Sequence, residues 1–155
     1  MEIERKFLVN IEEWKRVAKP KAKEIIQAYL TNEIEKSIRI RVKGDEAFIT
    51  VKGKQRGISR HEFEYEIPVS DAREMISLFA DNTIEKVRYE IPSNQYVWEV
   101  DVFKGKLTGL VIAEIELTNE NDQFDLPDWV GQEVSTDPTY LNANLIHLDK
   151  WEKVD

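Results

Sequence analysis

The chain has 155 residues and a formal net charge of −8, and 34% of its residues are charged. Apolar residues make up 41%, which is enough for a folded domain with a sizeable core. The negative charge argues against binding to nucleic acid or to an anionic membrane. The absence of cysteine excludes disulfide bonds and thiolate metal sites. We expect one domain over residues 1–155 in a cytoplasmic protein, without a signal peptide or membrane span.

The first nine residues, Met1–Val9, alternate in the manner of a β-strand. Glu2, Glu4 and Lys6 share one face, because side chains alternate across a strand with a period of two. The neighbouring carboxylates repel each other, and the lysine relieves only part of that repulsion. On one strand alone, a charged face turned to water is the simpler interpretation. The alternative is a carboxylate pair that holds a divalent cation, and recurrence of the pattern favours it.

The remaining elements follow from hydrophobic periodicity and from turn residues. In chain order, further strands are predicted over 25–31, 37–43, 48–52, 60–67, 86–91, 96–103 and 111–117. Helices are predicted after Asn10 (ended by Pro20), over 71–80 with Ser70 as N-cap, near Asn121, and over about 140–148. An antiparallel sheet of seven or eight strands with a few helices suits a closed or nearly closed barrel.

Charged residues recur on one face of nearly every predicted strand. In chain order they are Glu2, Glu4, Lys6, Arg39, Arg41, Lys52, Arg60, Glu62, Glu64, Lys86, Arg88, Asp101, Glu114 and Glu116. Solvated faces would mix their charges, whereas here residues of like sign are grouped. If the apolar faces turn outward under helices, the charged faces line an interior. Such an interior needs water, cations and an anion, because unpaired buried charge is costly.

The two kinds of charge together indicate phosphoryl chemistry. Lysine and arginine side chains suit a polyanion with several phosphates. Carboxylate pairs suit Mg²⁺ or Mn²⁺, which take oxygen ligands and share them with phosphate and water. The sequence has no Gly-x-x-x-x-Gly-Lys-Ser/Thr loop. Phosphate would therefore be held by side chains, with a metal-activated water as nucleophile.

The motifs also form an ordered set along the chain. They are Glu-x-Glu-x-Lys (2–6), Arg-Ile-Arg (39–41), Thr-Val-Lys-Gly (50–53), Arg-x-Glu-x-Glu (60–64), Lys-x-Arg-Tyr (86–89), Glu-x-Asp-x-Phe (99–103) and Glu-Ile-Glu (114–116). This set resembles the CYTH superfamily, or triphosphate tunnel metalloenzymes, and most closely its compact single-domain bacterial members. The resemblance implies an α+β fold, an eight-stranded antiparallel closed β-barrel that forms a triphosphate tunnel with flanking helices.

The resemblance also implies a function, namely metal-dependent hydrolysis of a small-molecule triphosphate with Mg²⁺ or Mn²⁺. By this likeness the substrate-binding residues are Lys6, Arg39, Arg41, Lys52, Arg60, Lys86 and Arg88. The implied metal ligands are Glu2, Glu4, Glu64, Asp101, Glu114 and Glu116, and the implied catalytic residues are Glu4, Glu62, Glu64, Glu116 and Lys6. Tyr29 is a weaker candidate near the tunnel mouth. Leu141 and Asn144 are neutral where related enzymes often carry lysines, which argues against phosphate binding by the last helix.

Inorganic tripolyphosphate is the leading substrate, cleaved to pyrophosphate and phosphate. A class IV-type adenylyl cyclase and a thiamine or nucleoside triphosphatase are the enzymatic alternatives. A non-catalytic polyphosphate or nucleotide binder is a further alternative, but pure anion binding gains nothing from so many carboxylates. A structural scaffold is the last. The oligomeric state stays open between a monomer and a homodimer.

Overall fold

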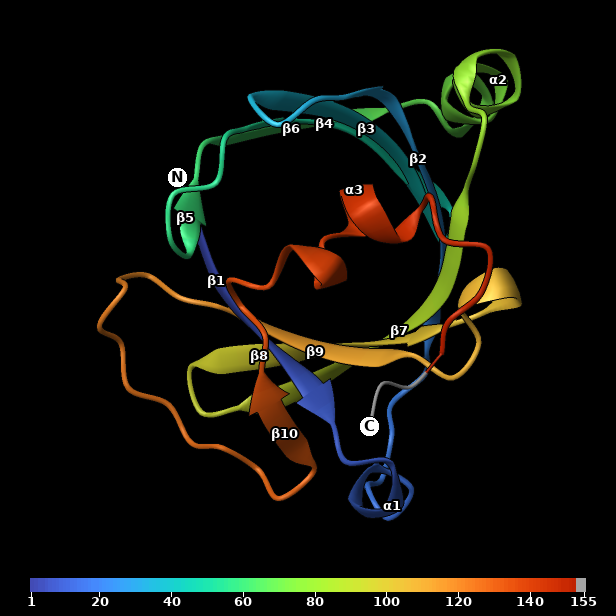
Figure 1. The fold of residues 1–155 in the computed structure, drawn as a ribbon. Coiled ribbons are helices and arrows are strands. Elements are labelled where there is room, and N and C mark those ends of the chain that lie inside the picture. The colour runs from blue at the N-terminus through green and yellow to red at the C-terminus, as the bar shows by residue number, and fades with distance from the viewer. Residues whose placement is uncertain (153–155) are drawn as a thin grey trace.

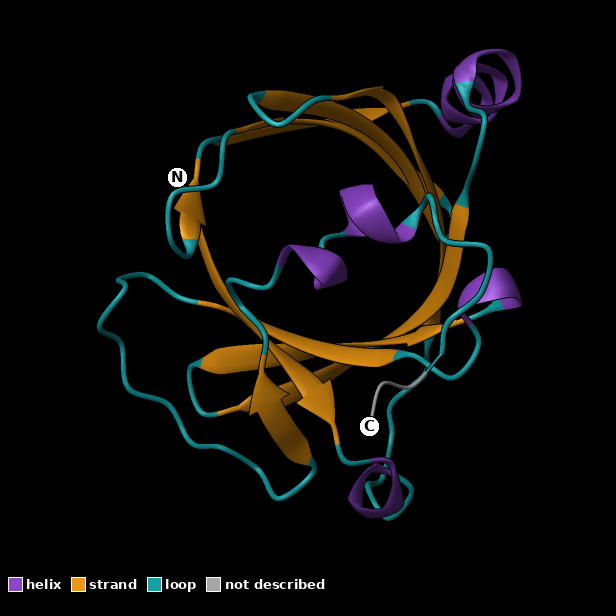
Figure 2. Cartoon of the chain, viewed as in Figure 1, coloured by secondary structure: helices purple, strands orange, loops and turns teal. Residues whose placement is uncertain are grey.

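The computed structural model describes residues 1–152, and ten antiparallel strands form a sheet that curves round on itself (Figures 1 and 2). The strands are β1 (Glu2–Val9), β2 (Lys23–Asn32), β3 (Lys36–Lys43), β4 (Glu46–Gly53), β5 (Ser59–Arg60), β6 (Glu62–Ile67), β7 (Ile84–Ser93), β8 (Tyr96–Phe103), β9 (Val111–Glu116) and β10 (Val130–Glu133). The helices are α1 (Ile11–Trp14), α2 (Val69–Phe79) and α3 (Asn142–Leu145), with two 3₁₀ turns, η1 (Gly105–Leu107) and η2 (Pro138–Tyr140).

The strand order corrects the prediction of an eight-stranded closed barrel. It runs β10-β1-β9-β8-β7-β2-β3-β4-β6, with β5 paired to β1 off this path, so the ladder has ten strands and is not closed. The physical reason lies at His61, where the predicted single strand 60–67 divides. Arg60 before it pairs with Glu2 of β1, whereas β6 after it pairs with β4. The polypeptide at His61 therefore connects the part of the wall paired with β1 to the part paired with β4.

Several further elements differ from the prediction: α1 ends at Trp14 rather than at Pro20, and the strand β10 was not predicted. Helix α2 begins at Val69 after the extended Pro68, and no side chain caps it, so Ser70 is not its N-cap. The predicted helix near Asn121 is a turn, because the Asp122 carboxylate accepts hydrogen bonds from the backbone and hydroxyl of Thr118 and competes with helical pairing. The predicted helix over 140–148 shortens to the four residues of α3.

Apolar side chains pack mainly on the outside of the curved sheet. Trp98 is fully buried there, with its ring 5.5 Å from Phe7 and 5.6 Å from Trp129 in edge-to-face contacts. Helix α2 covers β3 and β4 through Ala72 and its neighbours. Among the described residues, no helix combines the length and the apolar character that a membrane crossing requires.

One end of the interior is also apolar. Ile84 and Ile112 stand two residues from Lys86 and Glu114 on the same inward strand faces, and they pack against Leu145 of α3. Figure 1 shows η2 and α3 inside the ring of strands. The interior is therefore charged where the cavity lies, and an apolar cluster lies beside it.

Candidate active site

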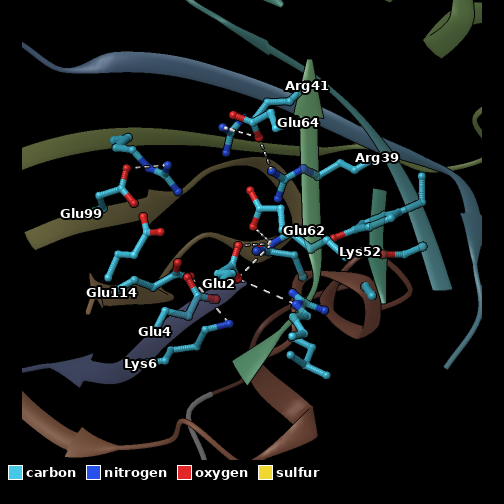
Figure 3. A pocket seen from close by; sticks show the side chains of 18 of the residues that line it. Glu2, Glu4, Lys6, Arg39, Arg41, Lys52, Glu62, Glu64, Glu99 and Glu114 are labelled. Carbon is cyan, nitrogen blue, oxygen red and sulfur yellow. Dashed lines mark hydrogen bonds and ion pairs between the residues drawn. The ribbon is translucent and has the colours of Figure 1, made fainter. Parts of the chain in front are cut away.

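A cavity of about 240 Å³ lies inside the curved sheet, and Figure 3 shows its charged side chains converging from opposite strands. It is lined by Glu2, Glu4, Lys6, Tyr29, Ser37, Arg39, Arg41, Lys43, Lys52, Arg60, Glu62, Glu64, Arg88, Glu99, Glu114, Glu116, Leu141, Asn142 and Ala143. The structure thus brings together every predicted site residue except two. Lys86 and Asp101 do not line the cavity.

Strand register explains why these residues meet. In the β1–β9 pair, Glu4 lies directly opposite Glu116 and Lys6 directly opposite Glu114. Opposite residues of an antiparallel pair share a face, so all four point inward. The like-signed carboxylates Glu4 and Glu116 are thereby held side by side in the wall, an arrangement that costs stability unless a cation offsets it.

The basic residues of β3 and β4 face this acidic wall. Arg39 and Arg41 each place a guanidinium nitrogen 3.7 Å from Glu64 Oε2, and Lys52 Nζ lies 3.3 Å from Glu2 Oε2. Burial, with Arg39 and Arg88 nearby, lowers the pKa of Arg41 to about 10. Burial and the charge of Arg39 similarly lower the pKa of Lys52 to about 8. These groups are crowded by their own positive charge, and a bound anion would relieve that crowding.

Lys6 connects the acidic wall to the C-terminal segment. Its Nζ donates a hydrogen bond to the Tyr140 carbonyl oxygen at 3.0 Å and lies 3.6 Å from Glu114 Oε1. An ammonium group has three donors, so one remains for a ligand in the cavity. Burial opposes ionisation of Glu114, but Lys6 and the nearby Arg88 outweigh it and lower the pKa of Glu114 to about 2.

Glu4 is a carboxylate of the wall whose charge no direct partner among the described residues offsets. Burial raises its pKa to about 8, and the charges of Glu114 and Glu2 add to this effect. Burial and the charge of Glu2 also raise the pKa of Glu116. No side-chain hydrogen bond or ion pair joins Glu4 to any other residue between 1 and 152. A cation placed here would stabilise the charged form of Glu4.

The donor chemistry of this wall fits a hard divalent cation. Glu2, Glu4 and Glu116 offer only carboxylate oxygens, which Mg²⁺ and Mn²⁺ prefer. Within residues 1–152, however, no three carboxylate or imidazole groups already converge as a ligand cluster. The residues therefore fit such an ion as part of a shell that phosphate and water oxygens would complete.

Lys86 and Asp101 lie on the same inward strand faces as Arg88 and Glu99, but they are buried outside the cavity lining. Lys86 is 2% exposed and Asp101 is 1% exposed, and their charged groups are 2.8 Å apart. Asp101 also accepts two hydrogen bonds from Arg88, at 2.7 and 2.9 Å. Arg88 itself reaches the cavity, where its Nη1 lies 2.9 Å from Glu99 Oε2.

Four polar lining residues were not among the predicted site residues: Ser37, Lys43, Glu99 and Asn142. Lys43 and Glu99 could have been found, because they continue the inward alternation of Arg41 and Asp101. Asn142 had no such signal, since α3 reaches the cavity through the tertiary fold. Leu141, Asn142 and Ala143 form the part of the wall that this segment supplies.

The model of the CYTH domain matches residues 1–146. The chain belongs to the CYTH domain family. A family member from Acetivibrio thermocellus, named inorganic triphosphatase, is 48% identical over 146 residues, covering 94% of this chain and 92% of the relative. Another inorganic triphosphatase, from Nitrosomonas europaea, is 36% identical over 150 residues, covering 93% of this chain and 95% of the relative.

Solved structures agree with this CYTH membership. The crystal structure of an inorganic triphosphatase has a TM-score of 0.62 and 32% identity, with 94% of each chain covered. A putative adenylate cyclase from Bacillus halodurans has a TM-score of 0.65 but 20% identity, covering 77% of this chain and 82% of its own. The latter likeness shows the shared fold alone.

Proposed function

We propose that this CYTH protein hydrolyses inorganic tripolyphosphate to pyrophosphate and phosphate, with Mg²⁺ or Mn²⁺ as the cofactor. The observation that carries the proposal is one cavity in which clustered basic residues of β3 and β4 face clustered carboxylates of β1 and β9, although each side also holds an opposite charge, such as Glu64 or Lys6. Arg39, Arg41 and Lys52 stand on the basic side, and Glu2, Glu4 and Glu116 on the acidic side. Two relatives that share more than a third of this sequence are named inorganic triphosphatases, which supports the same activity.

In this proposal the basic side chains bind and orient the phosphates. Arg39 and Arg41 each have a guanidinium nitrogen 3.7 Å from Glu64 Oε2. When the ligand binds, they would contact phosphate oxygens in place of Glu64. Lys6 and Arg88 hold the triphosphate from the opposite wall of the cavity. Arg60 and Lys52 complete the basic surface. Because phosphoryl transfer needs chiefly positioning and charge neutralisation, this arrangement addresses the main requirement of the reaction.

The carboxylates have the complementary role. Glu2, Glu4, Glu114 and Glu116 would hold the divalent cation, which, when bound, neutralises phosphate charge and lowers the pKa of a water molecule. Glu62 and Glu64 lie opposite and would orient the attacking water. The reaction adds one water across a phosphoanhydride bond and releases two products, pyrophosphate and phosphate.

The cavity itself favours an inorganic substrate. Its lining is almost entirely charged or polar, and Tyr29 and Leu141 are its largest side chains without formal charge. Recognition of a base or thiazole ring would require aromatic or apolar surface beside the phosphates. A volume of about 240 Å³ is also small for a nucleotide.

The test is phosphate release from tripolyphosphate, pyrophosphate, ATP and thiamine triphosphate, with and without Mg²⁺ and Mn²⁺. We expect fastest release from tripolyphosphate and none without a divalent cation. Cyclic AMP and pyrophosphate as products from ATP would instead identify a cyclase. Tripolyphosphate that stays intact for hours with either metal present would identify a binding protein and overturn the proposal.

A further inference from the structure

Asp101 is the centre of a buried charge cluster that borders the cavity without opening into it. Its Oδ1 accepts from Arg88 Nε at 2.7 Å, and its Oδ2 accepts from Arg88 Nη2 at 2.9 Å. Lys86 Nζ approaches Oδ2 at 2.8 Å. Asp101 is 1% exposed, so solvent and cavity ligands do not reach the carboxylate.

These contacts leave Asp101 poorly suited to metal binding. The carboxylate is already neutralised by two cations, and three short contacts occupy most of its acceptor positions. Burial would raise its pKa, but Arg88 and Lys86 hold the pKa far below the ordinary value. A metal ion would have to displace Lys86 or Arg88 from a site that is closed to the cavity.

The same contacts fix the orientation of Arg88. Its guanidinium is bound side-on by Asp101 through Nε and Nη2, while Nη1 donates to Glu99 at 2.9 Å. The group is planar, so these three hydrogen bonds determine where its remaining N–H groups point. Arg88 is the one member of the Lys86–Arg88–Asp101 cluster that lines the cavity.

Lys86 completes the arrangement from the other side. It precedes Arg88 by two residues on β7, so both side chains leave the same strand face. Without Asp101 the two cations would repel each other within a buried space. The carboxylate therefore holds both cations on the inward face, with Lys86 buried outside the cavity lining and Arg88 at the cavity surface.

We propose that Asp101 is a positioning residue for triphosphate binding, which acts through Arg88 by holding its guanidinium ready for a phosphate group. This inference rests on the proposed function, since it assumes that the cavity takes a phosphate chain. Preorganisation reduces the conformational entropy that Arg88 would otherwise lose when the ligand binds. Removing the carboxylate should therefore weaken ligand binding while the metal requirement stays as it is.

The experiment measures binding of tripolyphosphate by calorimetry in the absence of divalent cations, for Asp101→Asn, Arg88→Ala and the double variant. We expect Asp101→Asn to weaken binding about tenfold or more, as for a lost hydrogen-bonded charge contact. The double variant should bind no more weakly than Arg88→Ala, because Asp101 acts through Arg88. In turnover assays, KM should rise for Asp101→Asn, while the Mn²⁺ concentration for half-maximal rate should not change.

Additive losses in the double variant, or a raised Mn²⁺ requirement in Asp101→Asn, would overturn the proposal in favour of a direct metal role. Because Asp101→Asn leaves buried cations uncompensated, a second variant, Lys86→Met with Asp101→Asn, removes one of them. If this folded variant bound tripolyphosphate as tightly as the wild type, positioning by Asp101 would be refuted. Binding by the wild type without hydrolysis would refute the proposed activity alone and leave this inference intact.

Discussion

Glu4 and Glu116 face each other as direct partners across the β1–β9 pair, and both point into the cavity. The pKa of each is raised, chiefly by burial and then by neighbouring carboxylates. Two adjacent acids that lack a positive partner destabilise a fold. Their direct pairing at this position calls for a ligand that offsets their charge.

Replacement of Glu4 or Glu116 by glutamine should abolish most turnover. We expect the rate with tripolyphosphate to fall by about a hundredfold or more, since each variant removes a proposed ligand of the cation that neutralises charge on the transferring group. The Mn²⁺ concentration for half-maximal rate should rise as well. Glu74→Gln, an exposed position on α2, is the matched control and should behave as the wild type. Unchanged metal affinity in both cavity variants would contradict these roles.

Arg41→Ala should act differently, mainly on substrate affinity. The side chain is buried at the basic side of the cavity, where it would contact a phosphate. We expect KM for tripolyphosphate to rise by about tenfold or more, as for the loss of a charged hydrogen bond. Steady-state kinetics beside the exposed control Arg73→Ala measures this. The same kinetic defect in Arg41→Ala and Glu4→Gln would show that the division of roles is wrong.

Stability should decrease in acid partly because of Glu114. Its folded-state pKa of about 2 lies below the ordinary 4.5, so its ionised form is favoured by the fold. This contribution is fully present above pH 4.5 and is lost as pH falls towards 2. We expect the free energy of unfolding, measured by denaturant titration, to fall less between pH 6 and about 2.5 in Glu114→Gln than in the wild type. The difference should be about 1–3 kcal/mol overall. Parallel curves for the variant and the wild type would argue against this role.

The outer aromatic cluster should contribute strongly to folding. Trp98 has no exposed surface and contacts Phe7 and Trp129. Trp98→Ala should lower the free energy of unfolding by about 3–5 kcal/mol, because it creates a large cavity. Leu126→Ala, at a side chain that is 60% exposed, is the control and should change stability little. Equal losses in the two variants would mean that Trp98 does not anchor this layer.

Strand alternation predicted most of the cavity. It identified which side chains share a face, and so placed Glu4, Lys6 and Arg41 correctly inside. Alternation does not show, however, whether an inward side chain reaches the cavity surface. Asp101 and Glu99 share one face of β8, but only Glu99 lines the cavity. Whether a side chain reaches the cavity depends on the stagger between strands and on neighbouring charges, which local sequence does not encode.

Two other features lay outside local pattern for similar reasons. The break at His61 follows from a change of pairing partner, from β1 to β4, which depends on the whole sheet. The position of α3 depends on contacts such as that between Lys6 and the Tyr140 carbonyl, which are 134 residues apart in sequence. Long-range contacts of this kind leave no periodic signal.

Arg39, Arg41 and Arg88 line one and the same cavity, although they come from two different strands, β3 and β7. A reaction product that still carries two phosphates would bind the same arginines as the incoming substrate. This shared set of cationic groups therefore predicts competition between pyrophosphate and tripolyphosphate.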